Sequence, residues 1–427
     1  MEDSIEATVS GPAPRHPLAY RDYRLFWVVR FAGVIATMSI VVVLGWQVYD
    51  IARSDYGMSR SAAAFQLGIL GFVQFVPLLL LTPVSGLIAD RFDRRRVAAI
   101  AIGVDMLVAT GLGLATYYEA LSLPLLFLFA ALHGVARIFF GPAMSSLAPN
   151  LVPAPVIPRA IAVNSLAWQF ASILGPAVGG LLYAVFPSLP YIVAVGLMAL
   201  SVLLVSLIRP VRRPDVDRKA HPWRQIREGF SFVWKDRFLL GAISLDLFAV
   251  LLGGVTALLP VFARDILEVG PVGLGWMRAA PGIGAGLVAL WLAVKPLEKN
   301  VGVKMLIAVG VYGLATAAFG FSRELILSLC VLIVLGAADM ISVFVRTSLI
   351  QLNTPDAMRG RVSSISGLAI SASNELGELQ SGIAAALLGA TGAVVFGGAG
   401  AILVTVIWAF WFPELKNART FAPVYRE

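Results

Sequence analysis

The stretch GLIADRFDRRRV, residues 86–97, decides how the rest of this chain is interpreted. It is a short polar connection between two long apolar segments, and six of its twelve residues are charged. A helix that crosses a bilayer needs about 20 mostly apolar residues, because free backbone groups find no partner in hydrocarbon. A chain that alternates such segments with short charged connections is predicted to be an all-α integral membrane protein.

The composition of the whole chain agrees with this prediction. Its 427 residues are 59% hydrophobic and 14% charged, with a mean hydropathy of +0.85, whereas soluble domains carry about 25% charged residues. We expect twelve membrane-spanning helices. They fall near residues 25–51, 62–89, 95–117, 123–148, 157–186, 190–208, 238–263, 271–294, 302–321, 325–352, 361–389 and 391–412.

The basic residues predict the orientation in the membrane. Most of the 33 Lys and Arg residues lie in the connections on the side of the two termini, and the opposite loops hold only Arg53, Arg60, Arg264 and Arg323. Because cytoplasmic loops carry an excess of Lys and Arg, both termini are expected in the cytoplasm. The net charge of +8 is therefore interpreted as a topology signal, and no binding to nucleic acid is expected. Short external loops without a glycosylation sequon favour a bacterial inner membrane.

One long connection, residues 209–237, divides the spans into six and six. We predict an N-terminal tail and six-helix bundle over 1–208, a cytoplasmic linker over 209–237, and a C-terminal bundle and tail over 238–427. The second part of the linker mixes aromatic and basic residues, which favours a helix lying in the membrane interface. A soluble linker helix is the alternative.

The two halves contain an internal repeat. A shift of 202 residues, without gaps, places Gly134 on Gly336, Pro153 on Pro355 and Arg159 on Arg361. Parallel repeats of six helices are a transporter architecture, in which the substrate site lies between the halves near the midplane.

Two motifs carry a resemblance to a known family. The first stretch resembles the signature between the second and third helices of the major facilitator superfamily. The matching residues are Gly86, Leu87, Asp90, Arg91, Arg94 and Arg95, while Asp93 stands where that pattern has a glycine. The fifth span carries ILGPAVGG, in which Gly175, Pro176, Gly179 and Gly180 are similar to the signature of the family's antiporters. Together with TPDAMRGRV and NELGELQSG near the eleventh span, the chain most resembles the enterobactin-exporter and macrolide-efflux branch. The resemblance implies two pseudo-symmetric six-helix bundles.

The charged stretch has two interpretations. Asp90 ends a helix, and its carboxylate can accept hydrogen bonds from a neighbouring helix N-terminus, which carries about half a positive charge. We expect Asp90 to connect the halves at a cytoplasmic gate when the cavity faces outward. Alternatively, the arginines only set topology and bind anionic lipid.

Charged residues within the spans are the candidates for coupling, because an ionisable group at the bilayer centre costs at least about 2.5 kcal/mol. Six of them are singled out: Arg30, Arg137, Asp246, Asp339, Glu375 and Glu378. The repeat places Arg137 on Asp339, so we expect these two to face each other. When they separate, Asp339 is expected to lose the support of the arginine and take up a proton. Glu375 and Glu378 share one helical face, and Asp246 is expected to pair with Arg30. Structural ion pairs are the alternative.

The functional prediction is secondary transport. The chain has no phosphate-binding Gly-x4-Gly-Lys-Ser/Thr motif, no cluster of metal ligands and no identifiable nucleophile, so we expect neither an enzyme nor a cofactor nor a metal site. The expected partners are a small amphipathic substrate, protons and lipids, and the expected state is a monomer. The antiporter motif and the branch resemblance imply proton-coupled export of a drug or siderophore. Uptake or uniport of a small metabolite is the alternative.

Overall fold

The computed structural model describes residues 16–210, 222–295 and 297–421, and only the backbone at 83, 86, 87, 89, 90, 222–226, 356 and 357. Every regular element in these residues is a helix. Eleven spans within them are long and apolar enough to cross a membrane. Ten of these correspond to α1 (Arg21–Ser54), α2 (Arg60–Arg91), α3 (Arg94–Tyr117), α4 (Leu123–Leu147), α5 (Ile157–Val185), α6 (Leu189–Ser206), α8 (Arg237–Leu252), α10 (Gly270–Val294), α11 (Val301–Phe321) and α12 (Leu325–Leu352). The span in α2 ends at Thr82.

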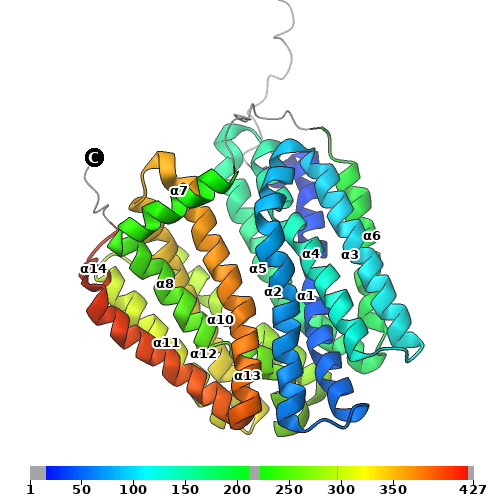
Figure 1. The fold of residues 1–427 in the computed structure, drawn as a ribbon. Helices are drawn as coiled ribbons and strands as arrows, with labels where there is room; N and C mark the ends of the chain where they lie inside the picture. The colour runs from blue at the N-terminus through cyan, green and yellow to red at the C-terminus, as the bar shows by residue number, and fades with distance from the viewer. Residues whose placement is uncertain (1–15, 211–221, 296, 422–427) are drawn as a thin grey trace, which may run out of the picture.

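The eleventh span, Met358–Trp411, belongs to α13 (Asp356–Trp411) and contains two crossings. Gly389 interrupts it with φ 74° and ψ 166°, a conformation that glycine adopts without a steric penalty. The shorter arm, residues 390–411, extends about 33 Å at 1.5 Å per residue, enough to cross the hydrocarbon. Figure 1 shows the arms as an orange and a red helix that meet at their lower ends. The described residues therefore contain the twelve predicted crossings.

The seventh crossing is broken, although the sequence predicted one continuous helix. After α8 the chain continues through the short helices η4 (Val255–Leu258), α9 (Leu259–Val261) and the π-helix η5 (Phe262–Ile266). The break falls at Gly253 and Gly254. Their carbonyls accept hydrogen bonds from the Tyr312 hydroxyl at 3.0 Å and the Ser381 hydroxyl at 3.0 Å, which replace the lost helical partners.

The helices form two bundles with matching packing. In the first, α3 lies between α4 and α6, and in the second, α11 lies between α12 and α13. The bundles meet where α2 packs on α13 and α5 packs on α10; Figure 1 shows the first in blue to green and the second in green to red. The all-α membrane architecture is confirmed. The domain boundaries at 208 and 237 stay predictions, and residues 211–221 between them lie outside the described part of the chain.

A helix follows in the second part of the long connection, as predicted. This helix, α7 (Pro222–Lys235), lies across one end of α8 and α13. Arg361 of α13 forms an ion pair of 2.9 Å with Glu228, while Phe230 and Trp234 are exposed and stacked 5.7 Å apart. We call the end of the bundle that carries α7 the linker end and the opposite one the far end. The position of α7 in a membrane interface stays a prediction.

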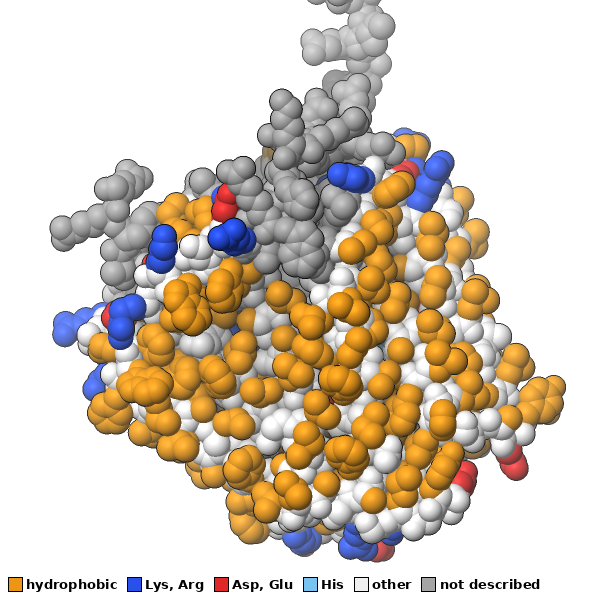
Figure 2. All heavy atoms as spheres, viewed as in Figure 1, with side chains coloured by type: hydrophobic (Ala, Val, Ile, Leu, Met, Phe, Trp, Pro, Cys, Tyr) orange, Lys and Arg blue, Asp and Glu red, His pale blue; other side chains and the backbone are white. Residues whose placement is uncertain are grey.

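The surface of the bundle suits a lipid environment. Large apolar side chains point outward along the helices; Leu107, for example, is 68% exposed. Figure 2 shows a broad apolar band on this face, with Lys and Arg gathered near the linker end and the far end. The band corresponds to the hydrocarbon of a bilayer.

Alanine substitutions at the two glycines that the repeat aligns, Gly134 and Gly336, are predicted to have unequal effects on stability. A Cβ on Gly336 would lie 1.9 Å from the Pro281 carbonyl oxygen of α10, whereas one on Gly134 would lie 3.6 Å from its nearest neighbours on α2. Gly336→Ala should therefore lower the thermal midpoint of the purified protein by several degrees, since overpacking costs about 1–3 kcal/mol. Gly134→Ala, and Gly310→Ala with no atom within 4 Å, are the matched controls. Equal midpoints for all three variants would contradict this packing.

Candidate transport site

Four charged side chains gather where the bundles meet. Glu375 and Glu378 lie on α13, Arg278 on α10 and Arg137 on α4. The Arg278 guanidinium is 3.8 Å from the Glu378 carboxylate and donates a hydrogen bond of 2.9 Å to the Thr256 carbonyl in the broken seventh crossing. Both arginines interact electrostatically with both glutamates. We call these four residues the central cluster.

Helix α2 brings the first bundle against the central cluster. A Cβ on Gly71 would lie 2.5 Å from the Glu378 Cβ, so only a glycine admits this approach. One turn further along α2, Gln74 is buried and its side-chain oxygen lies 3.5 Å from the Arg137 guanidinium. The glutamates of the second bundle are therefore in direct contact with the first.

Asp339 has different neighbours from those expected. Its electrostatic partners are Asp246 and Arg346, and among the described residues no contact joins it to Arg137. Asp246 forms a buried ion pair with Arg346, so its predicted pairing with Arg30 is wrong. Arg30 instead places its guanidinium over the Phe140 ring, 5.8 Å from the centroid.

The C-terminal bundle thus holds its own charge cluster. Arg346 is only 3% exposed. It forms an ion pair with Asp246 and interacts electrostatically with Asp339. A buried cation needs such compensation because hydrocarbon provides none. Pairing within one bundle explains why these charges do not face the opposite one.

A second set of charges joins the bundles at the far end. Asp265 of η5 accepts hydrogen bonds from the Tyr49 hydroxyl at 2.7 Å and the Arg53 guanidinium at 3.0 Å, and Arg60 of α2 lies at 3.5 Å. In return, Arg264 of η5 forms an ion pair of 2.7 Å with Asp50 of α1. We call these six residues the far-end network.

The sequence analysis did not find the far-end network. It counted Arg53, Arg60 and Arg264 only as basic residues of outer loops. The one available signal was that Arg53 and Arg264 lie within a few residues of an acid, Asp50 and Asp265 respectively, at the end of a span. The π-helix itself, a conformation frequent at functional sites, has no sequence signature.

The contacts of the charged stretch at residues 86–97 with the rest of the first bundle are made mainly by its arginines. Asp93 caps α3 and forms an ion pair of 2.6 Å with Arg95, whose hydrogen bond lowers the pKa of the Asp93 carboxyl. Arg95 also donates to the Ile208 carbonyl, and Arg94 donates to the Ser146 carbonyl at 2.8 Å. These contacts stay within the first bundle.

The remaining members of that motif are described less completely. Gly86 and Asp90 lie in the last turns of α2 and Arg91 is its last residue. The Asp90 side chain lies outside the described atoms, so the cytoplasmic gate stays a prediction. Asp93 has an extended backbone with φ −63°, which explains why no glycine is required there.

The glycines of the fifth span mediate close helix packing. A Cβ on Gly175 or Gly179 would lie within 2.6 Å of α1 side chains, and one on Gly180 would lie 2.3 Å from the Pro271 carbonyl oxygen of α10. Pro176 is buried between them. The motif therefore lets α5 contact both bundles, while its role in antiport stays a prediction.

Comparison with known proteins agrees with this geometry. The model of the Major Facilitator Superfamily matches residues 26–378. The chain belongs to this superfamily. It is accordingly a multi-pass membrane protein and a transporter rather than an enzyme.

Relatives and solved structures extend the comparison. The chain is 26% identical over 410 residues to the enterobactin exporter EntS of Escherichia coli K12, with 94% of each chain covered. Its fold is similar to a bacterial homolog of the human lysosomal transporter Spinster, with TM-score 0.69, 15% identity, and 96% and 98% of the chains covered. The nucleoside transporter NupG gives TM-score 0.70 at 13% identity, with 92% and 99% covered. At these identities the solved structures show the fold alone.

The buried ion pair predicts an asymmetric response to mutation. Arg346→Met leaves Asp246 and Asp339 without their cation, whereas Asp246→Asn leaves Arg346 with one carboxylate. Both variants should lose thermal stability, with the larger loss for Arg346→Met, because an uncompensated buried charge costs about 3–5 kcal/mol. The measurement is the thermal midpoint in detergent, with the exposed Lys304→Met as control. A milder effect of Arg346→Met than of Asp246→Asn would contradict the assignment.

The far-end network predicts a conformational effect of Asp265. Asp265→Asn removes the carboxylate that neutralises Arg53 and Arg60 on one bundle and Arg264 on the other, so repulsion should separate the far ends. Spin labels at Tyr56→Cys and Phe321→Cys, both exposed far-end positions, in a Cys330→Ser background would report longer separations in pulsed dipolar spectroscopy. The exposed Glu119→Gln serves as control. Identical distance distributions for wild type and Asp265→Asn would refute this role.

Proposed function

We propose that this transporter exports small amphipathic compounds, drug-like or siderophore-like, across a bacterial inner membrane by alternating access with proton antiport. In this proposal the linker end and both termini face the cytoplasm, in agreement with the excess of basic residues there. The far end then faces the outside. The far-end network supports the proposal, because ion pairs between the bundles can hold one end shut while the other opens.

The central cluster is the observation on which this proposal rests. Glu375 and Glu378 interact with Arg278 from their own bundle and with Arg137 from the other. Adjacent carboxylates disfavour each other's ionisation, and nearby cations favour it. When the bundles move apart and Arg137 withdraws, a glutamate loses part of that support and takes up a proton. Movement of the bundles is thereby linked to proton binding.

The direction of transport is supported by two likenesses. One is the named activity of the relative EntS, an enterobactin exporter, and the other is the antiporter-like motif of α5. Uptake or uniport of a small metabolite by the same fold is the alternative, and the experiment below distinguishes the two.

The test is accumulation of labelled compounds in cells that lack their own efflux pumps. The panel contains hydrophobic cationic dyes, a macrolide and enterobactin, each measured with and without a protonophore. Wild type is compared with Glu378→Gln and with the exposed control Glu298→Gln at equal membrane abundance. We expect wild type and Glu298→Gln to lower accumulation of at least one compound, and both the protonophore and Glu378→Gln to abolish this effect.

Other results would change the proposal in specific ways. Higher accumulation in wild type would indicate uptake. Export that continues with the protonophore present would contradict proton coupling, and export by Glu378→Gln at the wild-type rate would remove that residue from the mechanism.

A further inference from the structure

A buried acid and histidine lie outside the central cluster, within the first bundle. Asp105 is near the middle of α3 and His133 near the middle of α4. The Nδ1 atom of His133 is 2.6 Å from Oδ1 of Asp105, and the two residues are 0% and 5% exposed. The sequence analysis treated neither as a site. Their contact joins two helices at the depth where a charge is most costly.

The second ring nitrogen of His133 lacks a partner. Its Nε2 is buried and makes no hydrogen bond with any described residue. A carboxylate at Nδ1 orients the ring so that Nδ1 carries the hydrogen and Nε2 presents a lone pair. Since Nδ1 already carries a hydrogen, Nε2 is the atom of this ring at which an added proton would bind.

The charge balance of the pair favours the binding of a proton at Nε2. With neutral His133 and ionised Asp105, the pair carries a net negative charge in a low-dielectric interior. A proton added at Nε2 produces an imidazolium beside a carboxylate, with no net charge and a stronger hydrogen bond. The pair therefore has two states that differ by one proton.

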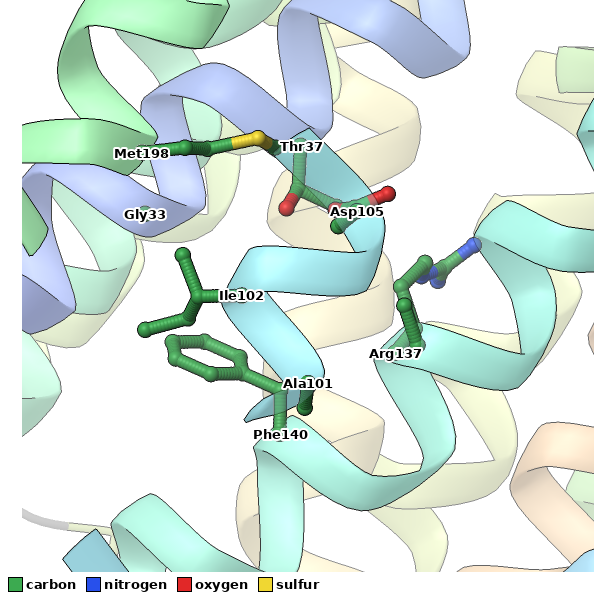
Figure 3. Close-up of a pocket in the computed structure, with 9 residues that line it drawn as sticks. Gly33, Thr37, Ala101, Ile102, Asp105, Arg137, Phe140 and Met198 are labelled. Atoms are coloured by element: carbon green, nitrogen blue, oxygen red, sulfur yellow. The ribbon is translucent and has the colours of Figure 1, made fainter. Parts of the chain in front are cut away.

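Arg137 is the charged group best placed to bias these states. It follows His133 by four residues on α4, and it lines one small pocket with Asp105, Thr37 and Met198. Figure 3 shows Thr37 and Asp105 close together, with Arg137 extending from α4 nearby. Among the described residues around the pocket, α1 contributes Arg30, which lies over the ring of the lining residue Phe140, while the α6 lining residue is the apolar Met198.

We propose that Asp105 and His133 form a second proton-binding site, coupled through Arg137 to Glu375 and Glu378. The site rests on the proposed proton coupling and adds a location for it in the N-terminal bundle. While the glutamates are ionised and close, they compensate the charge of Arg137, and the pair retains its proton at Nε2. When the glutamates are neutralised or withdrawn, the uncompensated guanidinium favours the anionic pair, and the proton passes from Nε2 to water.

The test observes His133 directly. The chain has three histidines, so the double substitution His16→Gln and His221→Gln leaves His133 as the only one. The full chain is labelled with ¹⁵N-histidine, placed in lipid nanodiscs, and followed by solid-state NMR from about pH 5 to 9, the range in which histidine titrates. We expect the ring signals to change from one to two protonated nitrogens as the pH falls.

Substitutions at the coupled residues should move this transition in opposite directions. Arg137→Gln removes a cation and should raise its midpoint, whereas Glu378→Gln leaves Arg137 less compensated and should lower it, each by roughly half a pH unit or more. The exposed Lys304→Gln and Glu298→Gln are the controls. If Arg137→Gln does not fold, Glu378→Gln decides the question alone.

Two results would overturn the proposal. A ring that keeps one protonation state across the whole range would make the pair a structural hydrogen bond. A transition whose midpoint is the same in wild type and Glu378→Gln would show that the pair is not coupled to the glutamates. Neither result depends on a transported compound, so failure here is distinct from failure of proton-driven export in cells.

Discussion

Hydrocarbon offers no partner to a charge or a free backbone group, and this constraint determines where the polar atoms of this transporter lie. The broken seventh crossing is possible because Tyr312 and Ser381 donate to the carbonyls of Gly253 and Gly254. Arg346 is buried because it lies beside two carboxylates. In both places a departure from a regular apolar helix is compensated by residues of other helices, so these polar contacts also determine how the helices pack.

The central cluster shows how packing and electrostatics depend on each other. The absence of a side chain at Gly71 allows α2 to lie against Glu378, and this contact places the glutamates of the second bundle within reach of Arg137 on the first. A bundle movement that opens the contact between α2 and α13 changes the surroundings of both acids at once. Close packing by small residues is therefore what makes the charges sensitive to conformation.

The sequence predicted the candidate residues better than their partners. It identified Arg137, Glu375 and Glu378 as charges within spans, and the structure brings these three together. The repeat suggested Asp339 as the partner of Arg137, but a repeat relates equivalent positions in two bundles and says nothing about the distance between their side chains. Arg278, which completes the central cluster, had no motif or repeat match that would have singled it out.

By itself the sequence determined the twelve crossings, the six-and-six division suggested by the long connection, the family and three of the four charges of the central cluster, because hydropathy and motif spacing depend only on neighbouring residues. Only the tertiary structure decided which charges meet. Tyr49 and Asp265 are 216 residues apart in the chain and 2.7 Å apart in the fold. Such pairs arise from the way two bundles pack, and a π-helix at residues 262–266 determines the direction in which Asp265 points.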